Sequence, residues 1–322
     1  RTLLLEREAQ PGYHATGRSA ALYTVAYGTP QVRALTAASR AFYDAPPAGF
    51  AEHPLLTPRG ELMVDFSGDA AELQRQYAQA REHVADARLL SADEACALVP
   101  VLRRERVHGA LFDPSAADID TAALHQGYLR GIRQQGGEVH CNREVLTITR
   151  HAGGWQVDCA GQSYYATVLI NAAGAWAAEL SLQATGVEIP VKPVKGQILL
   201  TERMPKLLNG CLTTSDCYMA QKDNGEILIG STTEDKGFDV TTTYPEIAGL
   251  VQGAVRCLPE LKDVNLKRTW AGLRPGSPDE LPILGPMRGV EGYLNACGHF
   301  RTGILTSAIT GVLLDKLVND EP

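Results

Sequence analysis

Apolar and polar positions alternate in two different ways along this chain. Residues 1–6 carry three consecutive leucines, a run typical of a strand buried on both faces of a parallel sheet. Residues 60–66 alternate apolar and polar side chains, as a half-buried strand does. Residues 30–43 open with a proline and then repeat apolar side chains at helical spacing. These patterns predict both strands and helices in the first part of the chain.

Helix signals continue through the next segments. Residues 69–85 form a polar amphipathic pattern, and residues 91–100 begin with a capping box made of Ser91 and Glu94. Residues 118–139 predict a helix of about four turns that ends at two glycines and is followed by a strand. A succession of helix, glycine and strand is typical of a growing parallel sheet.

The second half of the chain contains more strands than helices. Short strands lead to the apolar run at 166–176, and residues 190–265 predict antiparallel strands with one helix at 244–257. Residues 292–318 return to a strand followed by a helix. Two sets of segments therefore interleave, one α/β with glycine-rich turns and one mostly antiparallel.

Composition narrows the class of protein. A chain of 322 residues with 44% hydrophobic residues can bury the cores of two domains. Its 30 basic and 37 acidic residues give a net charge of -7 and form no blocks, which argues against nucleic-acid binding and suits a soluble enzyme. No apolar run approaches the ~20 residues of a membrane span, so we expect any membrane contact to be peripheral. Seven cysteines without a CxxC pair predict reduced thiols in a cytoplasmic protein, with no metal site.

Glu6 is the first candidate for cofactor binding. Dinucleotide-binding units hold the pyrophosphate on a G-x-G-x-x-G turn, and an acid about 20 residues further on binds the ribose. Glu6, at the end of the first strand, is placed like that acid, whereas these residues contain no such turn. We therefore expect a strand, glycine turn and helix of roughly 25 residues ahead of Arg1. The alternative is that Glu6 only ends a strand at the surface.

Two glycine-containing motifs favour the cofactor interpretation. In "INAAGAW" (170–176), small residues let a cofactor or another backbone approach closely. In "GHFRTGILTS" (298–307), Gly298 and Gly303 flank a turn that opens a helix, and the N–H groups around Gly303, Ile304 and Leu305 would suit the pyrimidine oxygen of a flavin. A tight strand-to-helix turn without a ligand is the alternative.

Together with Glu6 and "GRSAA" (17–21), these motifs make the whole chain resemble the FAD-dependent D-amino acid oxidase and glycine oxidase family. Residues 1–146 are similar to bacterial D-arginine dehydrogenases, and residues 172–322 resemble the glycine-oxidizing subunits of hydrogen cyanide synthases. The change of character between them favours a recombinant, designed or reconstructed sequence.

The resemblance implies an α/β fold in two parts. A Rossmann-like FAD-binding domain, lacking its first βα unit, would interleave with a substrate domain of mostly antiparallel sheet. The expected FAD-binding domain comprises 1–50, 119–189 and 266–322, and the substrate domain comprises 51–118 and 190–265.

The family also implies a set of FAD-binding residues. Glu6 would bind the adenosine ribose, and Val145 would meet the adenine through its backbone. The pyrophosphate and flavin would lie along Arg18, Ser19 and Ala20, with Gly174 and Trp176 close by and Gly298, His299, Gly303, Ile304 and Leu305 near the flavin ring. Arginine and serine donors suit a pyrophosphate. A structural role for His299 is the alternative.

For catalysis, the resemblance implies hydride transfer from Cα of a neutral amine to flavin N5, with the protein positioning the substrate. Arg274 and Tyr218 match the family's carboxylate clamp, and Arg301 would be a second cation near the carboxylate or the flavin. Thr24, Tyr27 and Glu61 match the side-chain pocket of D-arginine dehydrogenases, in which the acid faces a cationic side chain.

The expected activity is the oxidation of a D-amino acid or glycine to an imine, with a preference for basic D-amino acids. Leu22 departs from the D-arginine dehydrogenases, which carry a histidine there, and this weakens the case for arginine as the substrate. A subunit that depends on partner chains, as in a hydrogen cyanide synthase complex, is the alternative. A nicotinamide dehydrogenase is disfavoured because "GHFRTGILTS" has no role in that class. Oxygen, a quinone or a partner flavoprotein could accept the electrons. We expect a cytoplasmic protein, and a position peripheral to the inner membrane is the alternative.

Overall fold

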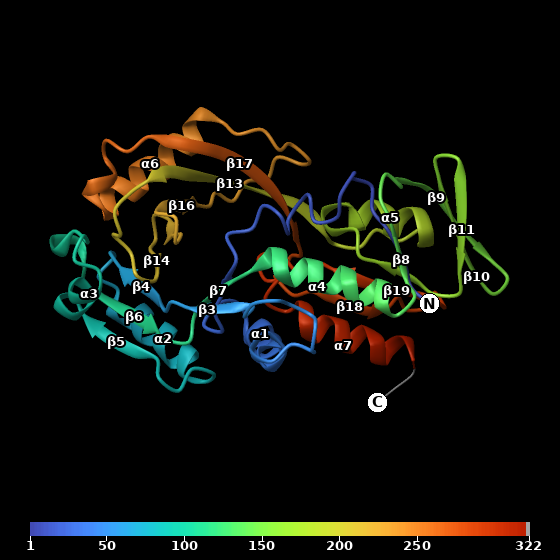
Figure 1. Cartoon of the computed structure of the whole chain (residues 1–322), viewed down its shortest axis with the longest axis horizontal. Helices are drawn as coiled ribbons and strands as arrows, with labels where there is room; N and C mark the ends of the chain where they lie inside the picture. The colour runs from blue at the N-terminus through green and yellow to red at the C-terminus, as the bar shows by residue number, and fades with distance from the viewer. Residues whose placement is uncertain (320–322) are drawn as a thin grey trace.

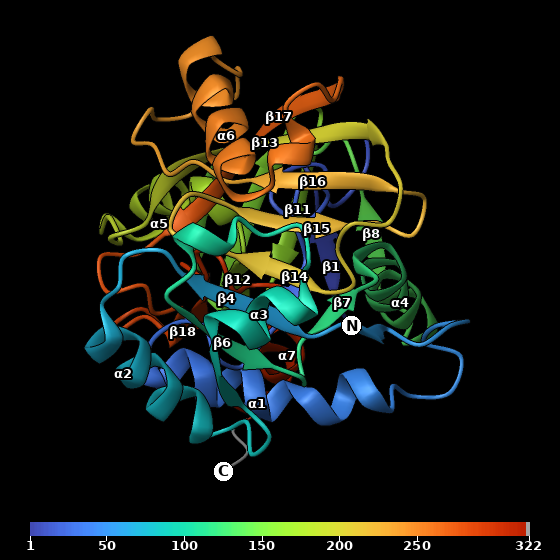
Figure 2. The ribbon, with the colours of Figure 1, turned by 90° about the vertical axis from the view of Figure 1, so that its left-hand side faces the viewer.

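The computed structural model describes residues 1–319 and consists of two units that lie side by side (Figure 1). An eight-stranded sheet forms the centre of one unit, and Figure 2 shows its strands from β17 at the top to β6 below. In spatial order the strands are β17 (Leu266–Gly276), β13 (Lys192–Arg203), β16 (Glu226–Gly230), β15 (Tyr218–Gln221), β14 (Cys211–Thr213), β4 (Glu61–Asp65), β6 (Gly109–Asp113) and β5 (Arg88–Ser91). Neighbouring strands are antiparallel except β14 and β4, which are parallel.

The core of this unit lies between the sheet and its helices. Buried leucines, isoleucines and alanines of the sheet pack against α3 (Ala92–Leu98) and α6 (Tyr244–Cys257), and α2 (Ala70–Arg81) lies beside β6. The predicted capping box is present, because the Ser91 hydroxyl accepts from the Glu94 N–H and the Glu94 carboxylate accepts from the Ser91 N–H. The antiparallel sheet predicted for 190–265 is confirmed, and β5 and β6 extend it beyond that prediction.

The second unit is α/β, as the sequence predicts. Strand β1 (Leu3–Leu5) pairs in parallel with β8 (Glu138–His140), and β12 (Leu169–Asn171) pairs in parallel with β19 (Tyr293–Cys297). The other elements are helices α1 (Pro30–Asp44), α4 (Thr121–Gln134), α5 (Ala177–Thr185) and α7 (Ser307–Val318), strand β18 (Ile283–Pro286) beside β19, and the antiparallel strands β9 (Val145–His151), β10 (Gly154–Cys159) and β11 (Gln162–Ala166). A small sheet of β2 (Leu22–Tyr23), β7 (Ala117–Ile119) and β3 (Leu56–Pro58) lies near the junction of the units.

Two local predictions need correction. Strand β1 is not buried on both faces, because Leu3 is 40% exposed and β8 is the one strand that pairs with β1 among residues 1–319. The helix predicted from residue 118 begins later, because residues 117–119 pair as β7. Asp120 then caps α4 by accepting from the Ala123 N–H at 2.8 Å.

Strand β17 connects the two units. It pairs with β13 along almost its full length, from Leu266 opposite Thr201 to Gly276 opposite Lys192. At its far end Gly276 forms a bridge with His299 of the α/β unit. A strand that we expected in the FAD-binding domain therefore also forms one edge of the eight-stranded sheet. The proposed division into domains stays a prediction.

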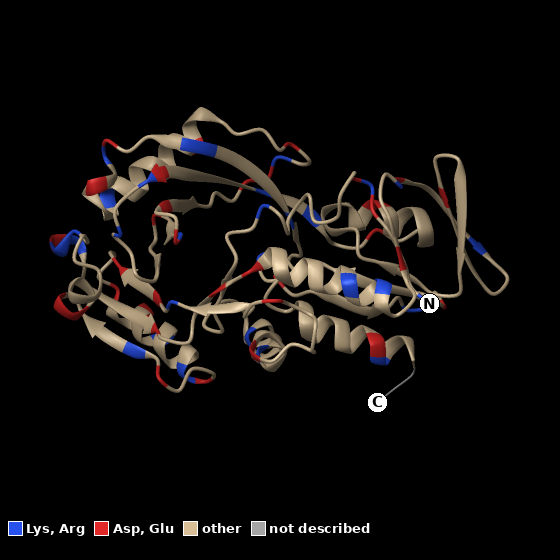
Figure 3. Ribbon diagram, in the orientation of Figure 1, with Lys and Arg blue, Asp and Glu red and all other residues tan. Residues whose placement is uncertain are grey.

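In the view of Figure 3, Lys and Arg residues are interspersed with Asp and Glu residues on both units. Within residues 1–319, no helix combines the length and the apolar composition that a membrane span requires.

Candidate active site

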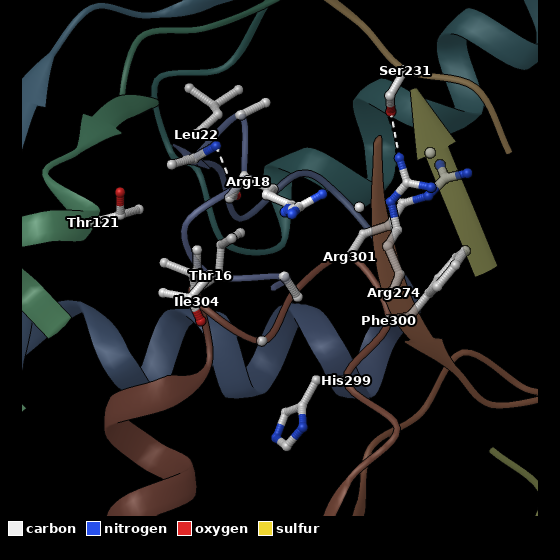
Figure 4. Close-up of a pocket in the computed structure, with 18 of the residues that line it drawn as sticks. Thr16, Arg18, Leu22, Thr121, Ser231, Arg274, His299, Phe300, Arg301 and Ile304 are labelled. Carbon is white, nitrogen blue, oxygen red and sulfur yellow. Dashed lines mark hydrogen bonds between the residues drawn. The ribbon is translucent and has the colours of Figure 1, made fainter. Parts of the chain in front are cut away.

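A cavity of about 680 Å³ lies at the junction of the two units, and part of its lining is drawn in Figure 4. Its walls come from the eight-stranded sheet, the loop at 15–22 and the turn before α7. All six residues predicted to bind or orient the substrate line it: Thr24, Tyr27, Glu61, Tyr218, Arg274 and Arg301. Eight of the predicted cofactor residues line it as well: Arg18, Ser19, Ala20, Gly174, His299, Gly303, Ile304 and Leu305.

Arg274 extends from β17 into the cavity wall (Figure 4). Its guanidinium donates to Ser231 Oγ at 2.6 Å and to the Thr232 carbonyl at 3.1 Å. Gly196 makes room for it, because a Cβ at that position would lie 2.2 Å from Arg274 Nη2. The pKa of Arg274 is lowered to about 10, mainly by burial and to a smaller extent by the positive charge of Arg301. The side chain thus stays cationic at neutral pH, in surroundings that favour an anionic ligand.

Arg301 adds a second, more exposed cation. It donates to the Tyr27 hydroxyl at 2.9 Å and to Thr233 Oγ1 at 2.7 Å. Figure 4 shows the Arg274 and Arg301 side chains beside each other. A carboxylate bound between them would relieve the repulsion that lowers the pKa of Arg274.

Tyr218 comes from β15 and already has a hydrogen-bond partner. Its hydroxyl donates to Cys211 Sγ at 3.3 Å, and burial raises its pKa well above the ordinary value. Cys211 is buried on β14, and its thiol lies 3.9 Å from Asp118 Oδ1. A thiol is a weak acceptor, so the phenol can exchange it for a stronger one in the cavity.

Glu61 is the buried acid of the cavity, with 5% of its surface exposed. Its Oε1 accepts from Thr213 Oγ1 at 2.6 Å, whereas Oε2 has no partner among the described residues. The pKa of Glu61 is raised to about 7, chiefly by burial; the hydrogen bond from Thr213 opposes this rise, and the charge of Asp113 adds to it. Thr24 donates to Asp113 Oδ2 at 3.2 Å and so supports this second acid.

The turn before α7 carries unpaired backbone donors. The N–H groups of Gly303, Ile304 and Leu305 have no acceptor within residues 1–319, and α7 has no side-chain cap at its N-terminus. These groups suit an oxygen that carries negative charge. Gly174, on another part of the wall, has a φ of 57° and no atom within 4 Å of a Cβ position, so the cavity is open there.

The loop at 15–22 is fastened to β17 through Arg18. The guanidinium donates to the carbonyls of Tyr13 at 3.1 Å and Ala271 at 2.5 Å, and the Arg18 carbonyl accepts from Trp270 Nε1 at 3.3 Å. Ser19 Oγ accepts from the Ala21 N–H at 3.0 Å. Arg18 therefore anchors this part of the wall.

Four predicted cofactor residues lie outside the cavity lining. Glu6 accepts from the Glu8 N–H at 2.9 Å, Val145 begins β9, and Gly298 lies against Ile283. The Trp176 indole stacks on the Phe238 ring, and neither residue lines the cavity. His299 Nε2 lies 3.2 Å from Thr310 Oγ1, and burial lowers the pKa of His299 to about 4, so the imidazole is neutral at pH 7.

Several residues of the wall were not singled out from the sequence. Gly196, Thr213 and Ser231 each contact a predicted site residue across the sheet. A glycine inside a strand signals a close approach, so Gly196 carried a readable signal. Thr213 and Ser231 carried none, because their partners lie on other strands.

An α/β unit and an antiparallel sheet share a cavity with cationic side chains on one wall and unpaired N–H groups on the other, an arrangement that suits an enzyme with an anionic cofactor and an anionic substrate. Residues 1–317 match the family described as FAD dependent oxidoreductases, and the chain belongs to that family. The open wall at Gly174 and the unpaired N–H groups of 303–305 fit such a cofactor.

Two relatives and one solved structure illustrate the likeness. The chain is 79% identical over 201 residues to hydrogen cyanide synthase subunit HcnC of Pseudomonas protegens. The aligned region covers 62% of this chain and 48% of that protein. It is 33% identical over 299 residues to glycine oxidase of Pseudomonas aeruginosa, covering 91% and 81% of the two chains. Glycine oxidase from Geobacillus kaustophilus has the same fold, with a TM-score of 0.90 at 24% identity over 99% of this chain and 88% of that one. This chain spans about half the length of the HcnC proteins that it matches.

Proposed function

We propose that this chain binds FAD and an amino acid and oxidises the Cα–N bond of glycine or a D-amino acid to an imine, which water then hydrolyses. Bound FAD would supply the hydride acceptor. The observation that carries this proposal is the placement of Arg274 and Arg301 on one cavity with the unpaired N–H groups of 303–305. One wall suits a carboxylate, and the other suits the anionic edge of a flavin.

The two arginines have two tasks in this proposal. They bind the substrate carboxylate, with Tyr218 giving up its bond to Cys211 to add a third donor. Their charges also favour the neutral form of the substrate amine, since an ammonium group beside two guanidinium groups is repelled. The neutral amine is the form from which the Cα hydride leaves.

Glu61 would determine which substrate side chains the cavity accepts. With a pKa of about 7, the carboxyl is mostly protonated in mild acid and ionised in mild base. The protonated form suits glycine, because burying a charge with no cationic partner is costly. The ionised form suits the cationic side chains of D-arginine and D-lysine, and the unpartnered Oε2 favours this second substrate class.

A role as one subunit of a hydrogen cyanide synthase-like complex is the second candidate. The similarity to HcnC supports it. Glycine would then lose four electrons and four protons in two steps, giving hydrogen cyanide and carbon dioxide. Oxygen, a quinone or a partner flavoprotein would accept the electrons.

Anaerobic bleaching of the flavin in the full-length protein tests both candidates without assuming an electron acceptor. The panel contains glycine, sarcosine and both enantiomers of alanine, phenylalanine, lysine and arginine, at pH 6 and pH 8. We expect bleaching by glycine and D-amino acids, with the basic ones gaining at pH 8 in the wild type and not in Glu61→Gln. Bleaching by glycine alone at both pH values would show that the protein is specific for glycine and that Glu61 does not select basic substrates. Bleaching by L-enantiomers, or by none of the panel, would contradict the proposal.

A further inference from the structure

The segment that follows β16, residues 231–239, begins at the cavity wall with Ser231 and contacts both arginines. We refer to it as the strap. Ser231 Oγ and the Thr232 carbonyl accept from Arg274, and Thr233 Oγ1 accepts from Arg301. Figure 4 shows the bond from Arg274 to Ser231. Three consecutive residues thus set the direction of two guanidinium groups, so a shift of the strap would move both.

The strap is fastened to β13 at Lys195. The backbones of Lys195 and Glu234 exchange two hydrogen bonds of 2.9 Å, and Lys195 Nζ lies 2.5 Å from Asp239 Oδ2. The side chain of Lys195 is only 1% exposed. Lys195 also precedes Gly196, the residue that makes room for the Arg274 guanidinium. One residue therefore borders the arginine on one side and holds the end of the strap on the other.

A second ion pair fastens the same segment but is built differently. Lys192 Nζ lies 2.5 Å from Asp235 Oδ2, and the two side chains are 61% and 71% exposed. Exposed pairs contribute little because water and salt screen them, whereas removing one member of a buried pair leaves a charge without compensation. The strap therefore carries one pair whose lysine is buried and whose Asp239 side chain is 39% exposed, and a second pair in which both side chains are exposed.

The far end of the strap contacts the α/β unit. Phe238 stacks on Trp176, with ring centroids 5.2 Å apart and an angle of 18° between the planes. Trp176 ends the segment that contains Gly174 on the cavity wall. The strap thus spans from the arginines to the wall on which we place the cofactor.

We propose that Lys195 and Asp239 are positioning residues whose ion pair holds the strap, and through it Arg274 and Arg301, in the geometry that receives a carboxylate. Neither side chain needs to touch the substrate. The role of the arginines rests on the proposed function, whereas the fastening of the strap does not.

The test compares Asp239→Asn with the control Lys192→Met in the full-length flavoprotein. Hydrogen exchange measured by mass spectrometry reports on residues 231–243. Anaerobic reduction of the flavin over a range of concentrations of glycine or the best substrate gives the half-saturating concentration, here called KM, and the limiting reduction rate. In Asp239→Asn we expect exchange of the strap to rise at least tenfold and KM to rise at least tenfold, with the limiting rate changed less than threefold. Lys192→Met should change neither. The double variant Lys195→Met/Asp239→Leu removes both charges and keeps the protein folded if the single variant unfolds, and it should show the same rise in KM.

Each other outcome is decisive. Unchanged exchange in Asp239→Asn would show that the pair does not hold the strap. Faster exchange with an unchanged KM would show that the strap does not position the arginines. Recovery of normal KM in the double variant would mean that the pair serves folding alone. If the wild type is reduced by no amino acid, the proposed function fails, while the exchange data still decide how the strap is held.

Discussion

Glu61→Gln should remove a pH-dependent cost to stability. In the folded protein the pKa of Glu61 is about 7, against an ordinary value of 4.5. The folded state therefore binds more protons than the unfolded state between these values, and the free energy of unfolding falls as the pH rises through this range. A pKa difference of this size corresponds to about 3 kcal/mol, at about 1.4 kcal/mol for each pKa unit. The cost is absent below pH 4.5 and complete above pH 7.

Urea unfolding at pH 5, 6, 7 and 8 measures this directly. Glutamine has nearly the shape of glutamic acid but does not titrate, so the stability of Glu61→Gln relative to the wild type should increase by about 2 to 3 kcal/mol from pH 5 to pH 8. Thr213→Val provides a second check. Its hydroxyl bond lowers the pKa of Glu61, and without that bond the transition should move to higher pH.

A stability difference that stays constant from pH 5 to pH 8 would refute the reasoning. It would show that Glu61 has the same charge in the folded and unfolded states throughout this range. The pH-dependent choice between glycine and basic amino acids would then lose its physical basis, whereas the carboxylate-binding role of the arginines would be unaffected.

Four further outcomes follow from individual contacts. Arg274→Ala removes a charge-assisted contact worth roughly 1.5 to 3 kcal/mol, so kcat/KM should fall at least about tenfold in steady-state assays while the flavin spectrum stays intact. Gly196→Ala places a Cβ 2.2 Å from Arg274 Nη2, and should displace the guanidinium and reproduce that loss without loss of FAD. Cys211→Val leaves the Tyr218 hydroxyl without its acceptor and should cost about 1 kcal/mol in urea unfolding; in a Tyr218→Phe background this cost should disappear. His299 has a pKa of about 4 instead of 6.5, so the wild type should lose up to about 3 kcal/mol between pH 6.5 and pH 4, a loss that His299→Gln should lack.

Local signals in the sequence predict the helices well. Pro30 begins α1, Ser91 and Glu94 mark the start of α3, and the structure contains both helices close to their predicted bounds. Such signals act within one turn of the backbone and need no information from the rest of the chain. The strands of 109–113 and 88–91 were missed because each is short and takes its place in the sheet only through its partners.

The site was predictable only in part. Resemblance to a family indicated Arg274, Tyr218 and Glu61, and all three line one cavity. Their immediate surroundings could not be read in the same way, because the pairing of strands and the packing of side chains decide them. Lys195 and Asp239 meet across a gap of 44 residues, and no local pattern marks either of them. Burial, which shifts the pKa of Glu61, is likewise a property of the assembled fold.

The order of strands in the sheet separates the two groups that we propose bind the opposite ends of the substrate. Arg274 stands on β17 and Glu61 on β4, and four hydrogen-bonded strands lie between them. Substitutions on β4 or on its neighbour β14 therefore leave the ladder that orients Arg274 intact. In the proposed function, Arg274 and Glu61 bind opposite ends of the substrate from separate strands, so a substitution on β4 can alter the side-chain end of the pocket while the pairing of β17 with β13 is retained.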